Sequence, residues 1–432
     1  MTQSAGPLDK KLLVDTAWNY GAFVLMAGTG VVLNFFIAAH FGTAALGQFN
    51  QIYAVYIVAA QLAVFGIHDA AQKYVAQHAG DTSSRLHAAR AAVGLAALFG
   101  LVIAAAVWLL AGAIGSIADS EPVGAGVALA APGLALFAVN KVLMGILNGE
   151  RRIRAFAIMQ GARVLAILTF AFFTADRGWP AYMLGAGFTV AEALIVLPLL
   201  ILVKPWRRGA EATEGTGLWL RRHLGFGGKA LPNGFLAESY VRVDVLMLAV
   251  FVDDVAIGIY SFAAMFIEGL YQVPVVVRTV VNPVLVRLIS DGDRAALGRF
   301  GRRIMALSLV TFIAAAGSVH LVFPYLAPWF PEGLVSSAAL VLLPLTIGLG
   351  LYAAFVPLDF ILMQAGQPGR QSALMTVNIL INVGLNIWLI PIYGIQGAAM
   401  ATAYAFAVSG LTLNAAVWRW LPMSGGLLFG GR

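Results

Sequence analysis

The chain has 432 residues, of which 60% are hydrophobic and 11% charged, with a formal net charge of +7 and no cysteine. An average soluble domain has about 25% charged and about 45–50% apolar residues. The composition therefore excludes a soluble enzyme, a nucleic-acid binder, a disordered scaffold and any disulfide framework, and it indicates a membrane protein.

Twelve stretches are long and apolar enough to cross a bilayer, which takes about 20 mainly apolar residues per helix. The first is too long for the apolar core of a signal peptide, which has about 7–15 residues. We expect 46–74 and 256–286 to tilt or to project, because they exceed the bilayer thickness. The predicted fold is all-α and polytopic, with spans at 18–39, 46–74, 90–110, 124–147, 155–174, 181–203, 229–251, 256–286, 304–323, 335–362, 371–390 and 396–418.

Lysine and arginine are concentrated in alternate loops. One set of loops carries most of them, including the run from Arg151 to Arg154, whereas the other set carries only Arg177. The positive-inside rule then places both termini in the cytoplasm. Most of the net charge is a topology signal, so we expect no nucleic-acid partner.

The predicted spans divide into two halves of six. We expect an N-terminal six-helix bundle at 1–205, a cytoplasmic linker at 206–228 and a C-terminal six-helix bundle at 229–432. The linker is rich in Gly, Glu, Thr and Arg, as connecting segments commonly are.

The two halves also resemble each other in sequence. Segment 35–49 aligns without gaps with 246–260, so that Gly47 meets Gly258, and the same offset pairs Gln61 with Gln272. Six spans per half give both halves the same direction through the membrane, and parallel repeats of this kind are common in secondary transporters. The alternative is that any two membrane halves look alike in hydropathy.

Four segments carry a resemblance to a known family. Asp244 lies in the seventh span and precedes the G-x-Y of Gly258-Ile259-Tyr260. Segment 378–403 contains the run IPIYGIQGAA, while 38–55 and 65–77 cover the first–second junction and the end of the second span. These segments resemble the polysaccharide transporters, including Wzx-type O-antigen flippases, of the multidrug/oligosaccharidyl-lipid/polysaccharide (MOP) exporter superfamily.

The resemblance implies two six-helix bundles around a central cavity. It also implies translocation of undecaprenyl-diphosphate-linked oligosaccharide, such as an O-antigen unit of lipopolysaccharide, across the bacterial inner membrane. Lipid II flippases of the same superfamily usually have two further C-terminal spans, so we expect the polysaccharide branch. Expected partners are the lipid-linked glycan, membrane lipid, a polysaccharide polymerase and glycosyltransferases, and we expect a monomer.

Charged residues inside spans are expensive, at roughly 2.5–3.5 kcal/mol each on insertion scales, and are functional candidates for that reason. A diphosphate crossing the bilayer needs cationic groups in place of water, and arginine can bind it with two parallel hydrogen bonds. The alternatives are a helical ion pair between Glu238 and Arg242, and pairing of Arg163 or Lys141 with carbonyls. The predicted ligands of the diphosphate and sugar are Arg278, Arg242, Lys141, Arg163, Lys229, Gln61 and Gln272.

Carboxylates inside spans can exchange a proton or hold Na⁺. The predicted ion-coupling residues are Asp244, Glu268, Asp359 and Glu238, with H⁺ or Na⁺ as the coupling ion. We expect no catalytic residue, no bound metal site and no other cofactor. Asp69 has the simpler interpretation of a helical pair with Lys73.

Polar residues line one face of two spans that the repeat relates. We interpret these faces as a shared wet surface, the alternative being hydrogen bonds between helices without any substrate. The faces comprise Asn50, Gln61, His68 and Gln72 in the second span and Ser261, Glu268, Gln272, Thr279 and Asn282 in the eighth. The ladder of Asn378, Asn382 and Asn386 is interpreted as structural.

Three other classes of protein fit the sequence less well than a flippase does. A multidrug exporter of the same superfamily favours organic cations and an acidic cavity, which five basic residues within spans do not suit. A major-facilitator transporter is disfavoured by the spacing of Asp293, Arg294 and Gly301. A membrane enzyme acting on lipid-linked sugars would need an acid/base cluster that the short outer loops lack.

Overall fold

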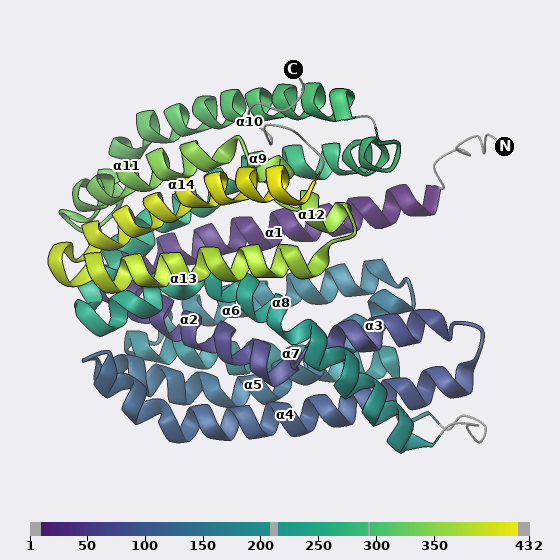
Figure 1. The fold of residues 1–432 in the computed structure, drawn as a ribbon. Helices are drawn as coiled ribbons and strands as arrows, with labels where there is room; N and C mark the ends of the chain where they lie inside the picture. The colour runs from purple at the N-terminus through teal and green to yellow at the C-terminus, as the bar shows by residue number, and fades with distance from the viewer. Residues whose placement is uncertain (1–9, 208–214, 293, 422–432) are drawn as a thin grey trace. The chain divides into compact units, whose positions relative to one another are not determined.

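The structure is a computed structural model that describes residues 10–207, 215–292 and 294–421 (Figure 1). Within these residues every regular element is a helix, which confirms the predicted all-α fold. The elements are α1 (Lys10–His40), α2 (Thr43–Val64), α3 (Ile67–Gln77), α4 (Thr82–Ile117), α5 (Glu121–Gly149), α6 (Ile153–Asp176), η1 (Ala181–Gly185), α7 (Ala186–Val203), α8 (Thr216–Phe251), α9 (Asp254–Ser290), α10 (Arg294–Val322), η2 (Phe323–Trp329), α11 (Leu334–Ala353), η3 (Val356–Leu358), α12 (Ile361–Gln364), α13 (Pro368–Tyr393) and α14 (Ile395–Trp420).

Most of these helices can cross a membrane. Ten helices among the described residues have the required length and apolar composition, and α2 with α3 makes an eleventh if the bent pair is one span. Each predicted span falls on one of these helices, on the α2–α3 pair or on α8. The chain is therefore a multi-pass membrane protein.

Two predicted spans are broken. The span predicted at 46–74 bends by 44° between α2 and α3. The break falls at Phe65 and Gly66, which have φ angles of 49° and 67°, in the left-handed region that ends a helix. A methyl group on Gly66 would lie 2.6 Å from the carbonyl oxygen of Gly227 in α8, so only glycine fits at this bend.

The span predicted at 335–362 is also discontinuous. α11 ends at Ala353, and the chain continues through the short helices η3 and α12. Pro357 lies in the first turn of η3 and cannot donate a backbone hydrogen bond. The break brings Asp359, which follows η3, into the interior of the protein.

The chain forms two compact units. Unit 1 comprises residues 1–41 and 48–239, and unit 2 comprises residues 42–47 and 240–432. α8 contributes to both, since it runs without interruption from Thr216 to Phe251. It begins inside the linker predicted at 206–228, of which residues 208–214 lie outside the described part of the chain.

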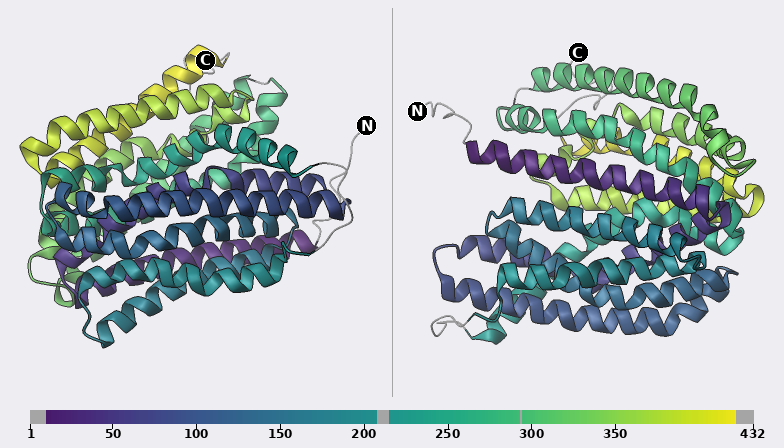
Figure 2. Two further views of the ribbon diagram at one scale, coloured as in Figure 1. Left: turned by 90° about the horizontal axis from the view of Figure 1, so that it is seen from below. Right: turned by 180° about the vertical axis from the view of Figure 1, so that it is seen from behind.

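Unit 1 is organised around α5, which packs against α3, α4 and α7, while α1 packs against α6. α4 and α5 lie side by side (Figure 2). Small residues permit this contact: a methyl group on Gly100 would lie 3.0 Å from the backbone of Ala135, and one on Gly115 would lie 3.0 Å from Gly124. Close approach at small residues is typical of helices packed in membranes.

Unit 2 has two packing centres. α14 packs between α11 and α13, and α9 packs against α10 and α11. The segment 42–47 at the start of α2 also joins this unit and contacts the first turns of α9. There Gly47 faces the backbone of Asp254 and Gly258, while Gly258 faces the backbone of Thr43. The two glycines that the sequence repeat pairs are therefore neighbours in space.

Candidate functional site

A buried carboxylate network lies in unit 2 around Asp244. α8 contributes Asp244, which is 9% exposed. Tyr260 of α9 and Thr402 of α14 donate hydroxyl hydrogen bonds of 2.8 and 2.6 Å to Oδ2, and Asn386 of α13 donates an amide hydrogen bond of 3.0 Å to Oδ1. All three donors are neutral, so within the described residues the carboxylate is hydrogen-bonded to dipoles rather than to a positively charged group.

The same network contains oxygen atoms that can bind a cation. Nδ2 of Asn386 also donates to Oδ1 of Asn382 at 2.9 Å, and Oδ1 of Asn386 is buried with no hydrogen-bond partner among the described residues. Carboxylate, amide and hydroxyl oxygens are the ligands that hard cations prefer. No group of three or more His, Cys, Asp or Glu side chains suited to a metal ion occurs among the described residues.

Sequence reasoning identified Asp244 but not the amides around it. The sequence predicts a structural role for Asn382 and Asn386, whereas the structure brings both to the Asp244 network. Asn378, the first member of the ladder, instead accepts a hydrogen bond of 2.9 Å from Thr412. The four-residue spacing of the asparagines was the available signal, since it places them on one face of a helix.

Arg278 and Asp359 form an ion pair in unit 2. Nη1 of Arg278 donates to both carboxylate oxygens of Asp359, at 2.9 and 2.8 Å. The guanidinium also lies 4.8 Å from the centre of the Phe360 ring, and Gln371 donates to the backbone oxygen of Asp359 at 2.9 Å. The structure therefore joins a predicted substrate ligand to a predicted coupling residue.

A second arginine of unit 2 is paired in the same way. Nη1 of Arg242 lies 3.1 Å from Oε1 of Glu268, whose side chain is 47% exposed. Glu268 therefore contacts Arg242 from the neighbouring helix α9. The predicted pairing of Arg242 with Glu238 falls on a glutamate side chain that lies outside the described part of the structure.

Unit 1 holds a third arginine–carboxylate pair. Nη1 of Arg163 on α6 lies 3.7 Å from Oε1 of Glu192 on α7, and the guanidinium lies 5.3 Å from the centre of the Phe137 ring. Asn140 of α5 donates 2.9 and 2.8 Å hydrogen bonds to the backbone oxygen and to Oε2 of Glu192. All three predicted arginine ligands are thus held by carboxylates of their own unit.

The remaining predicted ligands are distributed over several helices. Lys141 follows Asn140 on α5 and interacts electrostatically with Glu192. Gln61 lies on α2, where its Oε1 would be 3.4 Å from a methyl group on Gly234 of α8. Lys229 is exposed on α8, and Gln272 is half-buried on α9.

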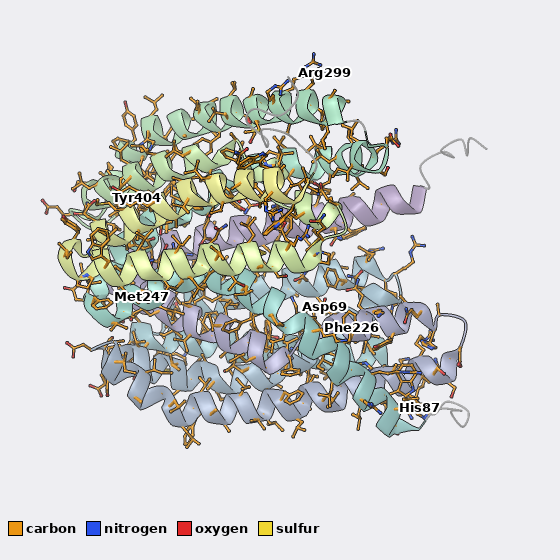
Figure 3. All side chains as sticks on the ribbon, viewed as in Figure 1. Asp69, His87, Phe226, Met247, Arg299 and Tyr404 are labelled. Atoms are coloured by element: carbon orange, nitrogen blue, oxygen red, sulfur yellow. The ribbon has the colours of Figure 1, made fainter. Side chains whose placement is uncertain are left out.

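The contacts of Asp69 differ from those predicted from the sequence. Its carboxylate lies 3.4 Å from Nε2 of His68, and the ammonium of Lys73 lies 4.5 Å from the centre of the Phe226 ring. Asp69 of α3 and Phe226 of α8 are labelled in Figure 3. The predicted pair of Asp69 with Lys73 is therefore replaced by a contact with the adjacent histidine and a cation–π contact.

The first part of α8 is anchored to α3. Tyr74 donates from its hydroxyl to the backbone oxygen of Arg222 at 3.3 Å, and Trp219 and His223 are fully buried. Nδ1 of His223 lies 2.8 Å from the backbone oxygen of Trp219. Burial lowers the pKa of His223, which precedes the predicted span at 229–251, because a charged imidazole would lose its hydration.

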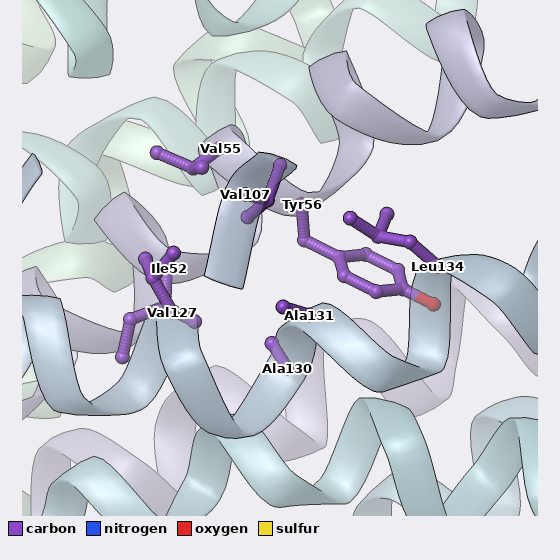
Figure 4. Close-up of a pocket in the computed structure, with 8 residues that line it drawn as sticks. All are labelled: Ile52, Val55, Tyr56, Val107, Val127, Ala130, Ala131 and Leu134. Atoms are coloured by element: carbon purple, nitrogen blue, oxygen red, sulfur yellow. The ribbon is translucent and has the colours of Figure 1, made fainter. Parts of the chain in front are cut away.

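A small pocket in unit 1 offers little to a polar cargo (Figure 4). It is lined by Ile52, Val55, Tyr56, Val107, Val127, Ala130, Ala131 and Leu134. Apart from the hydroxyl of Tyr56, these side chains are apolar, so the pocket provides no cationic ligand for a diphosphate.

Comparisons with known proteins identify a family and several solved structures that resemble this chain. A family model described as polysaccharide biosynthesis protein matches residues 12–289. A search of curated protein sequences found no match.

Several solved structures share the fold. A lipid II flippase, MurJ, in an inward closed conformation has a TM-score of 0.74 and 14% identity, covering 94% of this chain and 87% of that one. An inward-facing MATE family multidrug transporter of the MOP superfamily has a TM-score of 0.70 and 14% identity, covering 89% and 92%. A MOP superfamily transporter of Pyrococcus furiosus, described as having a binding pocket of reversed polarity, has a TM-score of 0.60 and 14% identity, covering 95% and 94%. At such low identity these likenesses establish the fold alone.

Proposed function

Because the chain belongs to the family of polysaccharide biosynthesis proteins, we propose that it is a flippase for undecaprenyl-diphosphate-linked oligosaccharide in the bacterial inner membrane. The observation that carries this proposal is the set of three arginines on membrane-spanning helices, each held by a carboxylate. An arginine kept in place within a span can exchange that carboxylate for the phosphates of a passing lipid.

Each of Arg278, Arg242 and Arg163 is proposed as a ligand of the diphosphate within its own unit, and Lys141 and Lys229 are proposed as further positive charges. The side chains of Arg278, Arg242 and Arg163 are 18%, 17% and 17% exposed, so each is largely buried. A guanidinium in such surroundings interacts more strongly with an anion than it would in bulk water. Gln61 and Gln272 supply amides that suit the hydroxyl groups of sugars.

Coupling to an ion gradient is proposed at Asp244. The carboxylate of Asp244, the oxygens of Asn382 and Asn386 and the hydroxyl of Thr402 form an oxygen-rich cluster suited to Na⁺. Occupation by a proton is the competing possibility, and the two differ in whether the pH or the sodium concentration drives transport. Asp359, Glu268 and Glu238 are proposed to respond to the cargo, since Asp359 and Glu268 already pair with arginine ligands.

The proposed topology has both termini in the cytoplasm. It rests on the concentration of lysine and arginine in alternate loops. The flippase is expected to work by alternating access as a monomer, without a catalytic residue and alongside glycosyltransferases and a polymerase. Gene fusions of a reporter to each terminus would test the orientation.

A multidrug exporter is the second candidate, because a MATE family transporter shares the fold. An exporter of organic cations should lower the intracellular level of cationic dyes, whereas a flippase should not. The test is deletion of the gene: we expect loss of surface glycan and accumulation of the lipid-linked precursor inside the cell. Normal surface glycan, without a substituting flippase, combined with increased dye sensitivity would favour the exporter.

A further inference from the structure

Unit 1 encloses a carboxylate to which the proposed function assigns only the pairing with Arg163. Glu192 of α7 is 2% exposed, and Asn140 of α5 is 0% exposed. Nδ2 of Asn140 donates to the backbone oxygen and to Oε2 of Glu192, while Arg163 approaches Oε1 only to 3.7 Å, beyond hydrogen-bond distance. The carboxylate therefore has one side-chain hydrogen bond, where an ionised carboxylate can accept about four.

Three buried polar atoms around this carboxylate have no hydrogen-bond partner within the described residues. They are Oδ1 of Asn140, Nη1 of Arg163 and the hydroxyl oxygen of Tyr56, a residue that is 4% exposed. A buried polar atom without a partner has lost its hydrogen bonds to water without replacement, so such atoms are rare in stable proteins.

The ring of Tyr56 brings its hydroxyl to this group. It stacks on Phe188 with ring centres 4.8 Å apart and meets Phe137 at 6.0 Å. Phe188 lies one helical turn before Glu192, and Phe137 lies almost one turn before Asn140. Tyr56 also interacts electrostatically with both Glu192 and Arg163.

The local charges restrict what can bind here. The ionisable groups that face Glu192 are Arg163 from α6, Lys141 from α5 and Tyr56 from α2, with Tyr53 one turn away on α2. Two cations oppose the entry of a metal ion, and the carboxylate opposes an anion. Arg163 and Lys141 also oppose protonation, because they favour the ionised carboxylate. A proton nevertheless suits the site better than a metal ion or an anion, because it needs no coordination shell and leaves a neutral carboxyl group at a position that is 2% exposed.

We infer that Glu192 is a proton-binding site of unit 1, separate from the Asp244 network. Protonation forms one O–H bond on the carboxylate, taking the proton from hydronium or water, and it converts an acceptor into a donor. Oδ1 of Asn140 and the Tyr56 hydroxyl are then the acceptors for this new donor. The site thus has hydrogen-bond partners for Glu192 in both of its protonation states.

Protonation also changes the state of Arg163. The guanidinium loses its charge partner but keeps its position over the Phe137 ring, because cation–π attraction does not depend on Glu192. A proton on Glu192 therefore makes the positive charge of Arg163 available to an anion.

Infrared difference spectroscopy of the purified full chain in lipid, without any cargo, tests this site. On acidification we expect a C=O stretching band of a protonated carboxyl group. That band should be lost in Glu192→Gln and kept in Glu268→Gln. Labelling glutamate with ¹³C should move the band in the otherwise unaltered protein, which keeps the test valid if Glu192→Gln does not fold.

Tyr56→Phe and Tyr53→Phe provide a matched pair of variants. Both rings pack on Phe188, so both substitutions preserve the packing. We expect Tyr56→Phe to shift the band and Tyr53→Phe to leave it unchanged. A glutamate-sensitive band that survives Glu192→Gln, or no band sensitive to glutamate labelling, would overturn the inference and leave Arg163 and Glu192 as a permanent ion pair. This result would have no bearing on the proposed cargo, because the experiment contains no cargo.

Discussion

Arg278 donates from a single nitrogen to both carboxylate oxygens of Asp359, and the pair links the long helix α9 to the break between α11 and α12. Removing one member of a buried pair leaves an unpaired charge, at a cost on the order of 3 kcal/mol. The two residues therefore cannot be assigned separate roles from single substitutions alone.

The first prediction separates the structural role of this pair from its role in transport. Arg278→Ala should abolish transport and lower the folded yield, because Asp359 is left unpaired. The double variant Arg278→Ala/Asp359→Asn should recover folding, measured by thermal unfolding in detergent, but not transport. Recovery of transport in the double variant would show that Arg278 does not touch the cargo.

The second prediction concerns the Asp244 network. A cation that binds only the folded protein stabilises it by about 2.7 kcal/mol at 100 times its Kd. We expect Na⁺, compared with choline, to raise the Tm of the natural protein and of Asp359→Asn but not of Asp244→Asn. If Na⁺ has no effect on any of the three proteins while acid protects only those that keep Asp244, the coupling ion is a proton instead.

The third prediction uses the contact between α2 and α9. A methyl group on Gly47 or Gly258 would meet backbone atoms of the facing segment, which cannot move aside as a flexible side chain can. Gly47→Ala and Gly258→Ala should each cost about 1–3 kcal/mol or more. Gly269→Ala on the same helix α9, with nothing within 4 Å of the added methyl group, is the control. Equal thermal stability of all three variants would contradict the close packing.

The fourth prediction concerns pH and the start of α8. Burial lowers the pKa of His223, so the unfolded chain binds this proton at a higher pH than the folded protein does. The stability contribution is therefore complete above the usual pKa of about 6.5 and is lost as the pH falls toward the lowered value.

Acidification should consequently increase hydrogen exchange in residues 216–228, where His223 anchors α8 beside α3. His223→Asn keeps a donor near the Trp219 oxygen but cannot titrate, so it should remove this pH dependence. His87→Asn is the matched control, because Nδ1 of His87 makes the same contact with the backbone oxygen four residues earlier, at 2.9 Å from Ser83, in a less buried place. Exchange that rises equally in the natural protein and in His223→Asn would exclude His223 as the cause.

The sequence predicted the spans better than their interruptions. Long apolar stretches determine where helices cross a membrane, and each predicted span has its helix or broken pair. A hydropathy pattern carries no information about the backbone conformation of individual residues. The break at Phe65 and Gly66, which adopt the left-handed conformation, was therefore not predicted. The start of α8 was missed because its glycines and charges are typical of loops, although Trp219 and His223 bury one side of it.

The residues of the candidate site could be predicted from their type, but the residue with which each one interacts could not. Placing a charged side chain inside a membrane costs free energy, and this cost identified Arg278, Arg163 and Asp359 as unusual residues. Their partners lie far away in sequence or on other helices, as with Arg278 and Asp359, which are 81 positions apart, and only the fold brings them together. Neutral partners such as Asn386 and Thr402 carry no such cost and gave a weaker signal.

The most direct test of the central claim is flipping by the purified protein in vesicles. A fluorescent undecaprenyl-diphosphate-linked oligosaccharide is placed in both leaflets, and a membrane-impermeant reductant quenches whatever reaches the outside. We expect the natural protein to make the inner-leaflet label accessible under an ion gradient, and Arg278→Ala/Asp359→Asn, although folded, to leave it protected. Label that remains protected with the natural protein under both sodium and proton gradients would contradict the account.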